Sequence, residues 1–188
     1  MRNIKSGMLN KVAAVALSAV IATGTTLAPA FAATNGSVGA TSSGSATVTA
    51  FVGALVRVTA VDDLALGTWT GVGSLATADN VCIWTTTGGY NVTASGDGGG
   101  GSDFALSNGA SGSLAYTVKW DDTASSSTLT TMTTGTALTG QVSGANSTDC
   151  NAGANLSATV AVEIAEADLT AADSGSYSGV LTLVIAPE

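Results

Sequence analysis

The side chains of this chain that could do chemistry are mostly carboxylates. Asp97 and Asp103 flank a Gly/Ser run, and two carboxylates around such a loop could hold Ca²⁺. The spacing lacks the EF-hand pattern, and a hairpin tip explains it as well. Asp62-Asp63 and Asp121-Asp122 resemble the paired acids of glycosidases. Both pairs follow expected strand ends, where Asp is a common turn residue. We therefore predict neither a metal site nor a catalytic residue.

The remaining chemistry-bearing residue types are scarce. Trp69, Trp84 and Trp120 could form a sugar-stacking platform, but a place in the core or on a half-buried surface suits them better. The chain has no His, two Cys and five Lys+Arg, which excludes a zinc cluster, a His-based triad and a nucleic-acid surface. No constellation supports an enzyme, and no cofactor is predicted.

Residues 1–32 have the composition of a secretory signal peptide. A basic leader precedes an eleven-residue run from Val12 to Ala22, mostly apolar, and Ala30-Phe31-Ala32 is a small-x-small cleavage site. The alternative is a transmembrane anchor, but the run falls short of the ~20 residues needed to span a bilayer. Cleavage before Ala33 would leave Arg57 and Lys119 against thirteen acidic residues. The sequence therefore predicts an acidic, exported protein.

The two cysteines both follow the expected cleavage site. In an oxidising compartment a single disulfide between Cys82 and Cys150 is the natural pairing. A free redox thiol is the alternative, and no CxxC motif or His supports it.

The elements that must position these residues are strands. Residues 46–60 alternate strictly, and the even positions form one unbroken face of small apolar side chains. Further strands are expected over 64–69, 81–86, 90–95, 104–107, 114–120, 137–142, 156–165 and 177–185. Thr87-Gly88-Gly89 predicts a hairpin between two of them, and 163–172 could form a helical turn. Many short strands with Gly-rich turns predict an all-β, antiparallel sandwich.

The alternating stretch is too long for one sandwich strand. Fifteen residues span roughly 50 Å, whereas such strands normally have five or six residues. Either Gly53 bends the stretch into two strands of one domain, or the first half leaves the domain and needs an apolar groove elsewhere. A neighbouring subunit that lacks a strand would supply that groove. The pattern alone leaves both outcomes open.

The order of these segments resembles the spore coat protein U family, the domain of archaic chaperone–usher pilins. The resemblance covers most of the chain after residue 45 and is carried by residues 46–52, 63–69, 81–92, 114–121 and 175–185. The most specific part of the resemblance is Gly175-Ser176-Tyr177 followed by an alternating strand. Family members usually pair the cysteine equivalent to Cys82 with one in the first domain strand, and Leu55 to Val58 holds none.

The resemblance implies an incomplete immunoglobulin-like β-sandwich over 54–188, completed by a donor strand from a neighbouring subunit. Residues 33–53 would be a flexible extension containing that strand. The inserted side chains would be Ala46, Val48, Ala50 and Val52, and the groove would be edged by Val56, Val58, Val180, Leu183 and Ile185. The partners would be copies of the same chain, a periplasmic chaperone and an outer-membrane usher.

These expectations predict a structural subunit of an extracellular pilus that mediates adhesion or biofilm formation. The alternative is a self-contained, secreted β-sandwich that acts as a binding module or adhesin. A secreted glycosidase is a distant third, and it would require one of the Asp residues to be catalytic.

Overall fold

The computed structural model describes residues 33–98, 103–109 and 112–188. The chain divides into two units, residues 1–50 and 51–188. In the described part of the first unit, Thr34 and Ser45 exchange two backbone hydrogen bonds of 2.9 and 3.0 Å. Residues 46–50 follow with no regular secondary structure, and the predicted signal peptide lies outside the described residues. Within the described ranges, no helix is long and apolar enough to cross a membrane.

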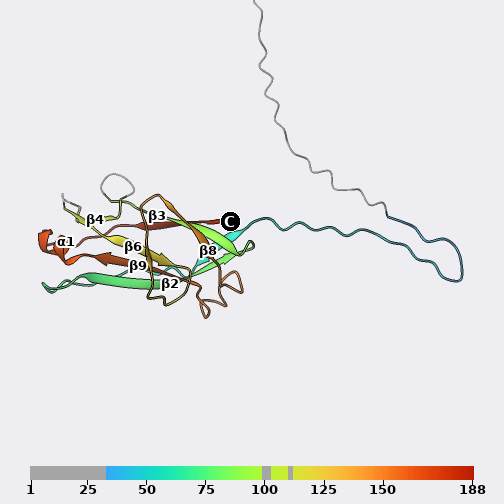
Figure 1. Cartoon of the computed structure of the whole chain (residues 1–188), viewed down its shortest axis with the longest axis horizontal. Coiled ribbons are helices and arrows are strands. Elements are labelled where there is room, and N and C mark those ends of the chain that lie inside the picture. Colours follow the sequence, from blue (N-terminus) through green and yellow to red (C-terminus); the bar gives the residue numbers. More distant parts are fainter. Residues whose placement is uncertain (1–32, 99–102, 110–111) are drawn as a thin grey trace, which may run out of the picture. The chain divides into compact units, whose positions relative to one another are not determined.

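Two antiparallel sheets build the second unit (Figure 1). The five-stranded sheet has the order β1-β2-β9-β6-β7, and its members are β1 (Val56–Thr59), β2 (Leu75–Thr85), β9 (Ala158–Ile164), β6 (Thr117–Asp121) and β7 (Thr130–Thr131). The three-stranded sheet has the order β10-β3-β8, with β10 (Leu181–Pro187), β3 (Gly89–Gly96) and β8 (Ala137–Val142). A further pair joins β4 (Ala105–Ser107) to β5 (Ser113–Ala115).

The core lies between the two main sheets. Alternate side chains of β2, β6 and β9 and of β3 form one buried cluster. Tyr90 of β3 and Trp120 of β6 meet edge to face across it, with ring centroids 6.4 Å apart and planes at 83°. This is the arrangement of a β-sandwich, and the prediction of an all-β, antiparallel, immunoglobulin-like fold is confirmed.

The predicted hairpin across Thr87-Gly88-Gly89 is wrong. β2 and β3 flank this turn, but they belong to different sheets and do not pair. The hydroxyls of Thr85 and Thr87 are hydrogen-bonded at 2.8 Å, and the Thr87 hydroxyl donates to the Gly89 carbonyl at 2.8 Å. Gly88, at φ +80°, lets the backbone cross from one layer of the sandwich to the other.

The predicted strand over residues 64–69 does not form. Leu64 and Leu66 are half-buried and alternate with exposed residues, as in a strand, but Gly67 takes a left-handed conformation at φ +80° and shifts the next half-buried residue to Trp69, and no described strand pairs with this segment. The preceding β1 is only four residues long, since Ala60 takes a left-handed conformation at φ +57° and ends it. Residues 64–69 therefore have no neighbouring strand to pair with among the described residues.

The predicted helical turn is α1 (Glu166–Ala171), which lies between β9 and β10. No side chain caps its start, but Glu166 and Asp168 place negative charge in the first turn, where the helix dipole favours it. Leu169 is buried and fixes the helix against the core.

Candidate functional site

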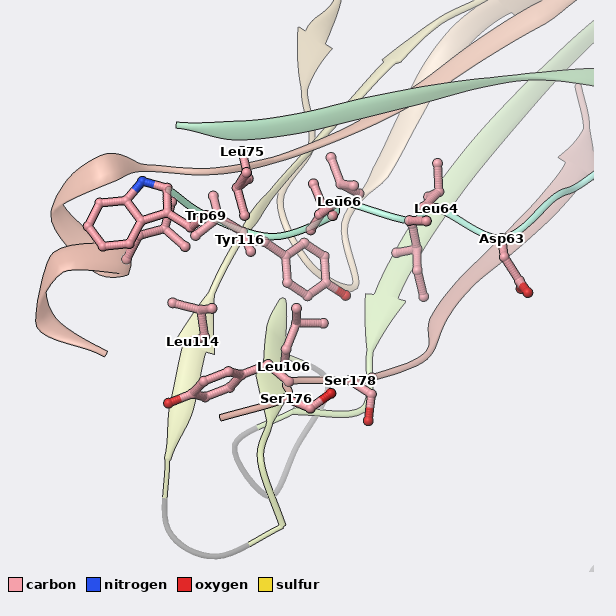
Figure 2. Close-up of a pocket in the computed structure, with 18 of the residues that line it drawn as sticks. Asp63, Leu64, Leu66, Trp69, Leu75, Leu106, Leu114, Tyr116, Ser176 and Ser178 are labelled. Atoms are coloured by element: carbon pink, nitrogen blue, oxygen red, sulfur yellow. The ribbon is translucent and has the colours of Figure 1, made fainter. Parts of the chain in front are cut away.

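An elongated apolar groove opens on one side of the sandwich (Figure 2). Its volume is about 1120 Å³. One wall is the extended segment 61–69, and the other is the segment 172–181 with the first residues of β10. The groove therefore lies where two stretches of backbone face each other with no strand between them.

The floor and walls of the groove are made of core-type side chains. Val160, Val162 and Ile164 of β9 form part of its floor and are at most 5% exposed. Larger side chains above them are only half-buried, and these are Leu64, Leu66, Trp69, Leu75, Leu106, Leu181 and Leu183. A groove with this lining exposes to water the surface that a sandwich normally buries.

The rim of the groove is polar and fixed by hydrogen bonds. Ser178 exchanges two backbone hydrogen bonds with Ser107 of β4, at 2.9 and 3.0 Å. The backbone N–H of Val180 donates to Asp97 at 2.8 Å. Trp69 donates its indole N–H to the Gly73 carbonyl at 2.9 Å. These contacts hold both walls in place without closing the groove.

Strand edges are left unpaired beside the groove. β10 pairs with β3 on one side, and no described strand pairs with its other side. β1 is likewise the edge strand of the five-stranded sheet. A free edge presents backbone N–H and C=O groups that can pair with a further strand.

The residues before β1 are held in the direction of that strand. Leu55 donates its backbone N–H to the Thr86 hydroxyl at 2.9 Å and accepts the Thr86 N–H at 3.0 Å. The same hydroxyl donates to the Gly53 carbonyl at 3.0 Å. Gly53 therefore continues the line of β1 and does not bend the chain back.

The predicted donor residues belong to this extended stretch. Val48 and Val52 are 93% and 75% exposed, and Ala46 and Ala50 are exposed too. Between 46 and 55 the described chain forms no strand. Large exposed apolar side chains of this kind are typical of a segment that binds another surface.

Only some of the predicted groove-edge residues line the groove. Val180 and Leu183 line the groove. Val56, Val58 and Ile185 pack against the core beside it and do not line it. The wall opposite β10 is the segment after β1, because β1 ends at Thr59 and the chain turns at Ala60.

Asp97, Asp121 and Asp122 accept backbone hydrogen bonds, and Asp62 and Asp63 line the groove. Asp121 accepts the backbone N–H of Thr123 at 2.9 Å and closes a turn, whereas Asp122 accepts that of Val142 at 2.7 Å and links the end of β6 to β8. Asp97 holds Val180, while residues 99–102 of the same loop lie outside the described residues. The described ranges contain no cluster of three metal-ligating side chains.

The three tryptophans do not form a platform. Trp120 is fully buried in the core, Trp84 is half-buried on β2, and Trp69 lines the groove. Burial raises the pKa of Tyr90 far above its usual range, against a smaller lowering by the Trp120 indole, to which the hydroxyl makes no hydrogen bond of normal geometry. Burial, followed by the charge of Asp97, also raises the pKa of Tyr116, which lines the groove.

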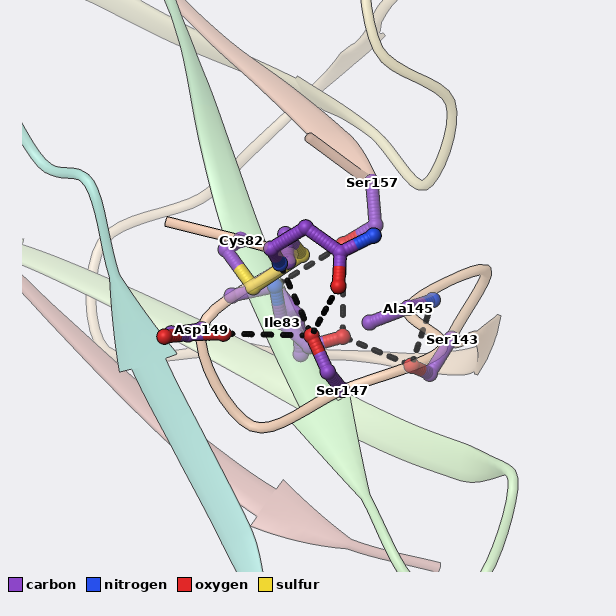
Figure 3. The surroundings of a disulfide bond; sticks show 9 residues. Cys82, Ile83, Ser143, Ala145, Ser147, Asp149 and Ser157 are labelled. Atoms are coloured by element: carbon purple, nitrogen blue, oxygen red, sulfur yellow. Dashed lines mark hydrogen bonds between the residues drawn. A yellow bond between two sulfur atoms is a disulfide. The ribbon is translucent and has the colours of Figure 1, made fainter. Parts of the chain in front are cut away.

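The predicted disulfide is present (Figure 3). Cys82 of β2 and Cys150 are fully buried, and their Cα atoms lie 5.8 Å apart. The bond ties the loop between β8 and β9 onto the outer face of β2. Ile83 reinforces this contact, because its N–H donates to the Ser157 hydroxyl at 2.8 Å and its carbonyl accepts the Ser143 hydroxyl at 2.6 Å. The disulfide is therefore structural and lies outside the groove lining.

The fold and the groove define an antiparallel β-sandwich domain with an unpaired strand edge over an apolar groove. No family model and no curated protein matches the chain. Among solved structures, the chain is similar to one described as a chaperone–tip adhesin complex in CFA/I fimbriae biogenesis, with a TM-score of 0.47 and 16% identity. The match covers 72% of this chain and 41% of that one, so this chain spans about two fifths of its length.

Proposed function

We propose that this chain is a structural subunit of an extracellular pilus or fimbria and polymerises by donor-strand exchange. The donor is the segment of Ala46, Val48, Ala50 and Val52, and the acceptor is the groove of the next copy. The observation that carries the proposal is the apolar groove between residues 61–69 and β10, which lies beside an unpaired strand edge.

The donor and the groove have complementary side chains. The groove is already lined by Leu, Ile and Trp, so an inserted strand must present small apolar side chains to avoid overpacking. The even positions of 46–52 present only Ala and Val, and strand periodicity places them all on one face. The odd positions Thr47, Thr49 and Phe51 would face outward.

The donor and the groove also match in length. The nine wall residues 61–69 could span at most about 30 Å if fully extended, and the seven donor residues 46–52 span about 23 Å, so the donor is short enough for the groove. Pairing with the free edge of β10 would satisfy the backbone groups of the donor and fix its register.

We infer that the acceptor is another copy because Thr86 fixes the short link between the donor and β1. Thr86 holds Gly53 and Leu55 in line with β1, and only three residues separate Val52 from that strand. To reach the groove of its own copy, the donor would have to turn back within the short link that Thr86 holds. Donation to the next copy keeps them and links the copies into a filament.

Assembly of such a filament needs help before export. A subunit with an exposed apolar groove tends to aggregate, so a periplasmic chaperone would cover the groove and an outer-membrane usher would exchange it for the donor. Residues 1–32 would direct the chain to the periplasm. The finished filament would lie at the cell surface and mediate adhesion or biofilm formation.

Gel electrophoresis of the exported protein tests the proposal. Unheated samples are expected to run as a ladder of multimers without reductant, because each donor strand is held by a full set of backbone hydrogen bonds. Heating should collapse the ladder to monomer. A self-contained binding module would run as monomer in both samples, and that result would overturn the proposal.

A further inference from the structure

The segment that precedes the proposed donor folds back on itself. Thr34 and Ser45 form an antiparallel bridge with two backbone hydrogen bonds of 2.9 and 3.0 Å, and their hydroxyls lie 2.6 Å apart. Residues 34–45 are therefore a closed hairpin. Because Ser45 directly precedes Ala46, the hairpin ends where the donor begins.

Two glycines let the two limbs of this hairpin approach closely. A Cβ atom at Gly36 would collide with the Ser42 hydroxyl and would lie 2.9 Å from the Ser43 carbonyl oxygen. A Cβ atom at Gly44 would lie 3.0 Å from the Thr34 carbonyl oxygen. A side chain at Gly36 would therefore force the limbs apart.

The donor is also fixed at its other end. The Thr86 hydroxyl accepts the N–H of Leu55 and donates to the carbonyl of Gly53. The seven residues between Ser45 and Gly53 are 46–52, and they form no strand. These are the residues whose even positions carry the apolar side chains proposed to enter the groove.

Alternation alone does not fix the register of such a donor. A slip by one residue would turn the wrong face to the groove, but a slip by two residues keeps the same face inward. A slip that brings Ala54 into the groove would have to free Gly53 from Thr86. A slip in the other direction would insert Gly44 and leave Val52 outside.

A closed hairpin prevents that second slip. Each wall of the groove is a single segment, and a second limb would lie about 4.8 Å beside the first, where a wall stands. The limbs are also rich in Ser and Thr, whose hydroxyls are costly to bury without partners. We propose that the hairpin 34–45 is a register stop, which makes Ala46 the first residue of the donor to enter the groove. This inference rests on the proposed polymerisation.

The register stop would keep all junctions of a filament equal. A junction in the slipped register buries Gly44 in place of Val52 and so loses the burial of one valine. Such a junction is about 10- to 100-fold weaker than one in the proper register. A filament that contained slipped junctions would break at them first.

A hairpin that cannot open provides the first test. In the double variant Thr34→Cys/Ser45→Cys the two thiols replace hydroxyls that already face each other, so oxidation should join the limbs by a disulfide. Oxidation should leave the heat-sensitive ladder within about twofold of its amount before oxidation. Loss of the ladder on oxidation would show that the hairpin must open for assembly, and the register stop would be wrong.

A hairpin that cannot close provides the second test. Gly36→Val should open it, whereas Ala40→Val adds bulk to the same hairpin at an exposed residue. Dissociation of the polymer is followed at one elevated temperature on gels. The unmodified protein and Ala40→Val should dissociate in one phase, and Gly36→Val should show an added phase about 10- to 100-fold faster.

Amide hydrogen exchange of the unmodified polymer locates the register directly. Slow exchange should begin at Ala46, and residues 35–44 should exchange quickly, because an isolated hairpin protects its amides poorly. Slow exchange within 35–44, or one-phase dissociation of Gly36→Val, would overturn the register stop and leave polymerisation standing. The absence of any ladder in the unmodified protein would overturn polymerisation, and the register stop with it.

Discussion

Replacing Val48 by Asp should abolish assembly, whereas the same change at the next residue should not. Val48 is 93% exposed in the described chain, so nearly its whole side chain is available for burial in the groove. Full burial of a valine contributes about 1.5–3 kcal/mol. Because 1.4 kcal/mol is a factor of ten in an equilibrium constant, loss of this side chain alone weakens each junction about 10- to 100-fold.

The carboxylate adds a second penalty. An unpaired charge moved into an apolar groove costs several kcal/mol beyond the lost valine, so Val48→Asp should leave only monomer. Thr49→Asp adds the same charge on the opposite face of the donor, which strand periodicity turns toward solvent. We expect its ladder to match that of the unmodified protein.

Quantitative gel densitometry of unheated samples provides the assay. The ratio of multimer to monomer should fall at least tenfold for Val48→Asp and less than about threefold for Thr49→Asp. Equal ladders for both variants would show that residue 48 does not enter an apolar site. Equal loss of multimers in both variants would show that a charge anywhere in the segment prevents assembly. The assignment of an inserted face would then be wrong.

Three further predictions concern the stability of the domain. Tyr90→Phe removes a buried hydroxyl that makes no hydrogen bond of normal geometry, so unfolding in denaturant should show no loss and a gain of up to about 1 kcal/mol; the raised pKa of Tyr90 means that the unmodified protein loses stability relative to the variant above pH 10. Replacing Cys82 and Cys150 together by Ala opens a loop with a sequence separation of 68 and should cost about 4 kcal/mol, which thermal unfolding would measure as a lowered midpoint; an unchanged midpoint would contradict a structural role. Lys119 lowers the pKa of the Glu163 carboxyl through a hydrogen bond and its charge, so the stability from this pair is present above pH 4.5 and is lost as the pH falls through the lowered pKa. Glu163→Gln should therefore cost less than about 1 kcal/mol at neutral pH, because the pair is half-exposed, and its cost should shrink as the pH falls below 4.5.

The sequence predicted most of the fold because alternation and composition determine strands locally. Residues 137–142 form β8 at the predicted bounds, and the predicted turn over 163–172 contains α1. The disulfide followed from the presence of two cysteines alone. The sequence did not reveal which strands pair with each other. The turn at Thr87-Gly88-Gly89 suits a hairpin, but β2 pairs with β9 and β3 pairs with β10, and such long-range choices depend on which faces are buried together.

The groove was predicted only in outline for the same reason. Leu64 and Leu66 have the alternation of a strand and are half-buried, but the alternation ends at Gly67 and no described strand pairs with this segment. The absence of an adjacent strand does not change the local residue pattern, so this segment could not be recognised from the sequence as a groove wall. The left-handed conformation of Ala60, which ends β1, could not be predicted either, since alanine has no preference for that conformation.

A structure of the exported polymer by electron cryo-microscopy tests the central claim most directly. We expect density for a single extended strand between residues 61–69 and β10, continuous with Gly53 of the adjacent copy and with Val48 directed at the groove floor. An empty groove, a groove filled by residues of the same copy, or a polymer joined through another surface would contradict it.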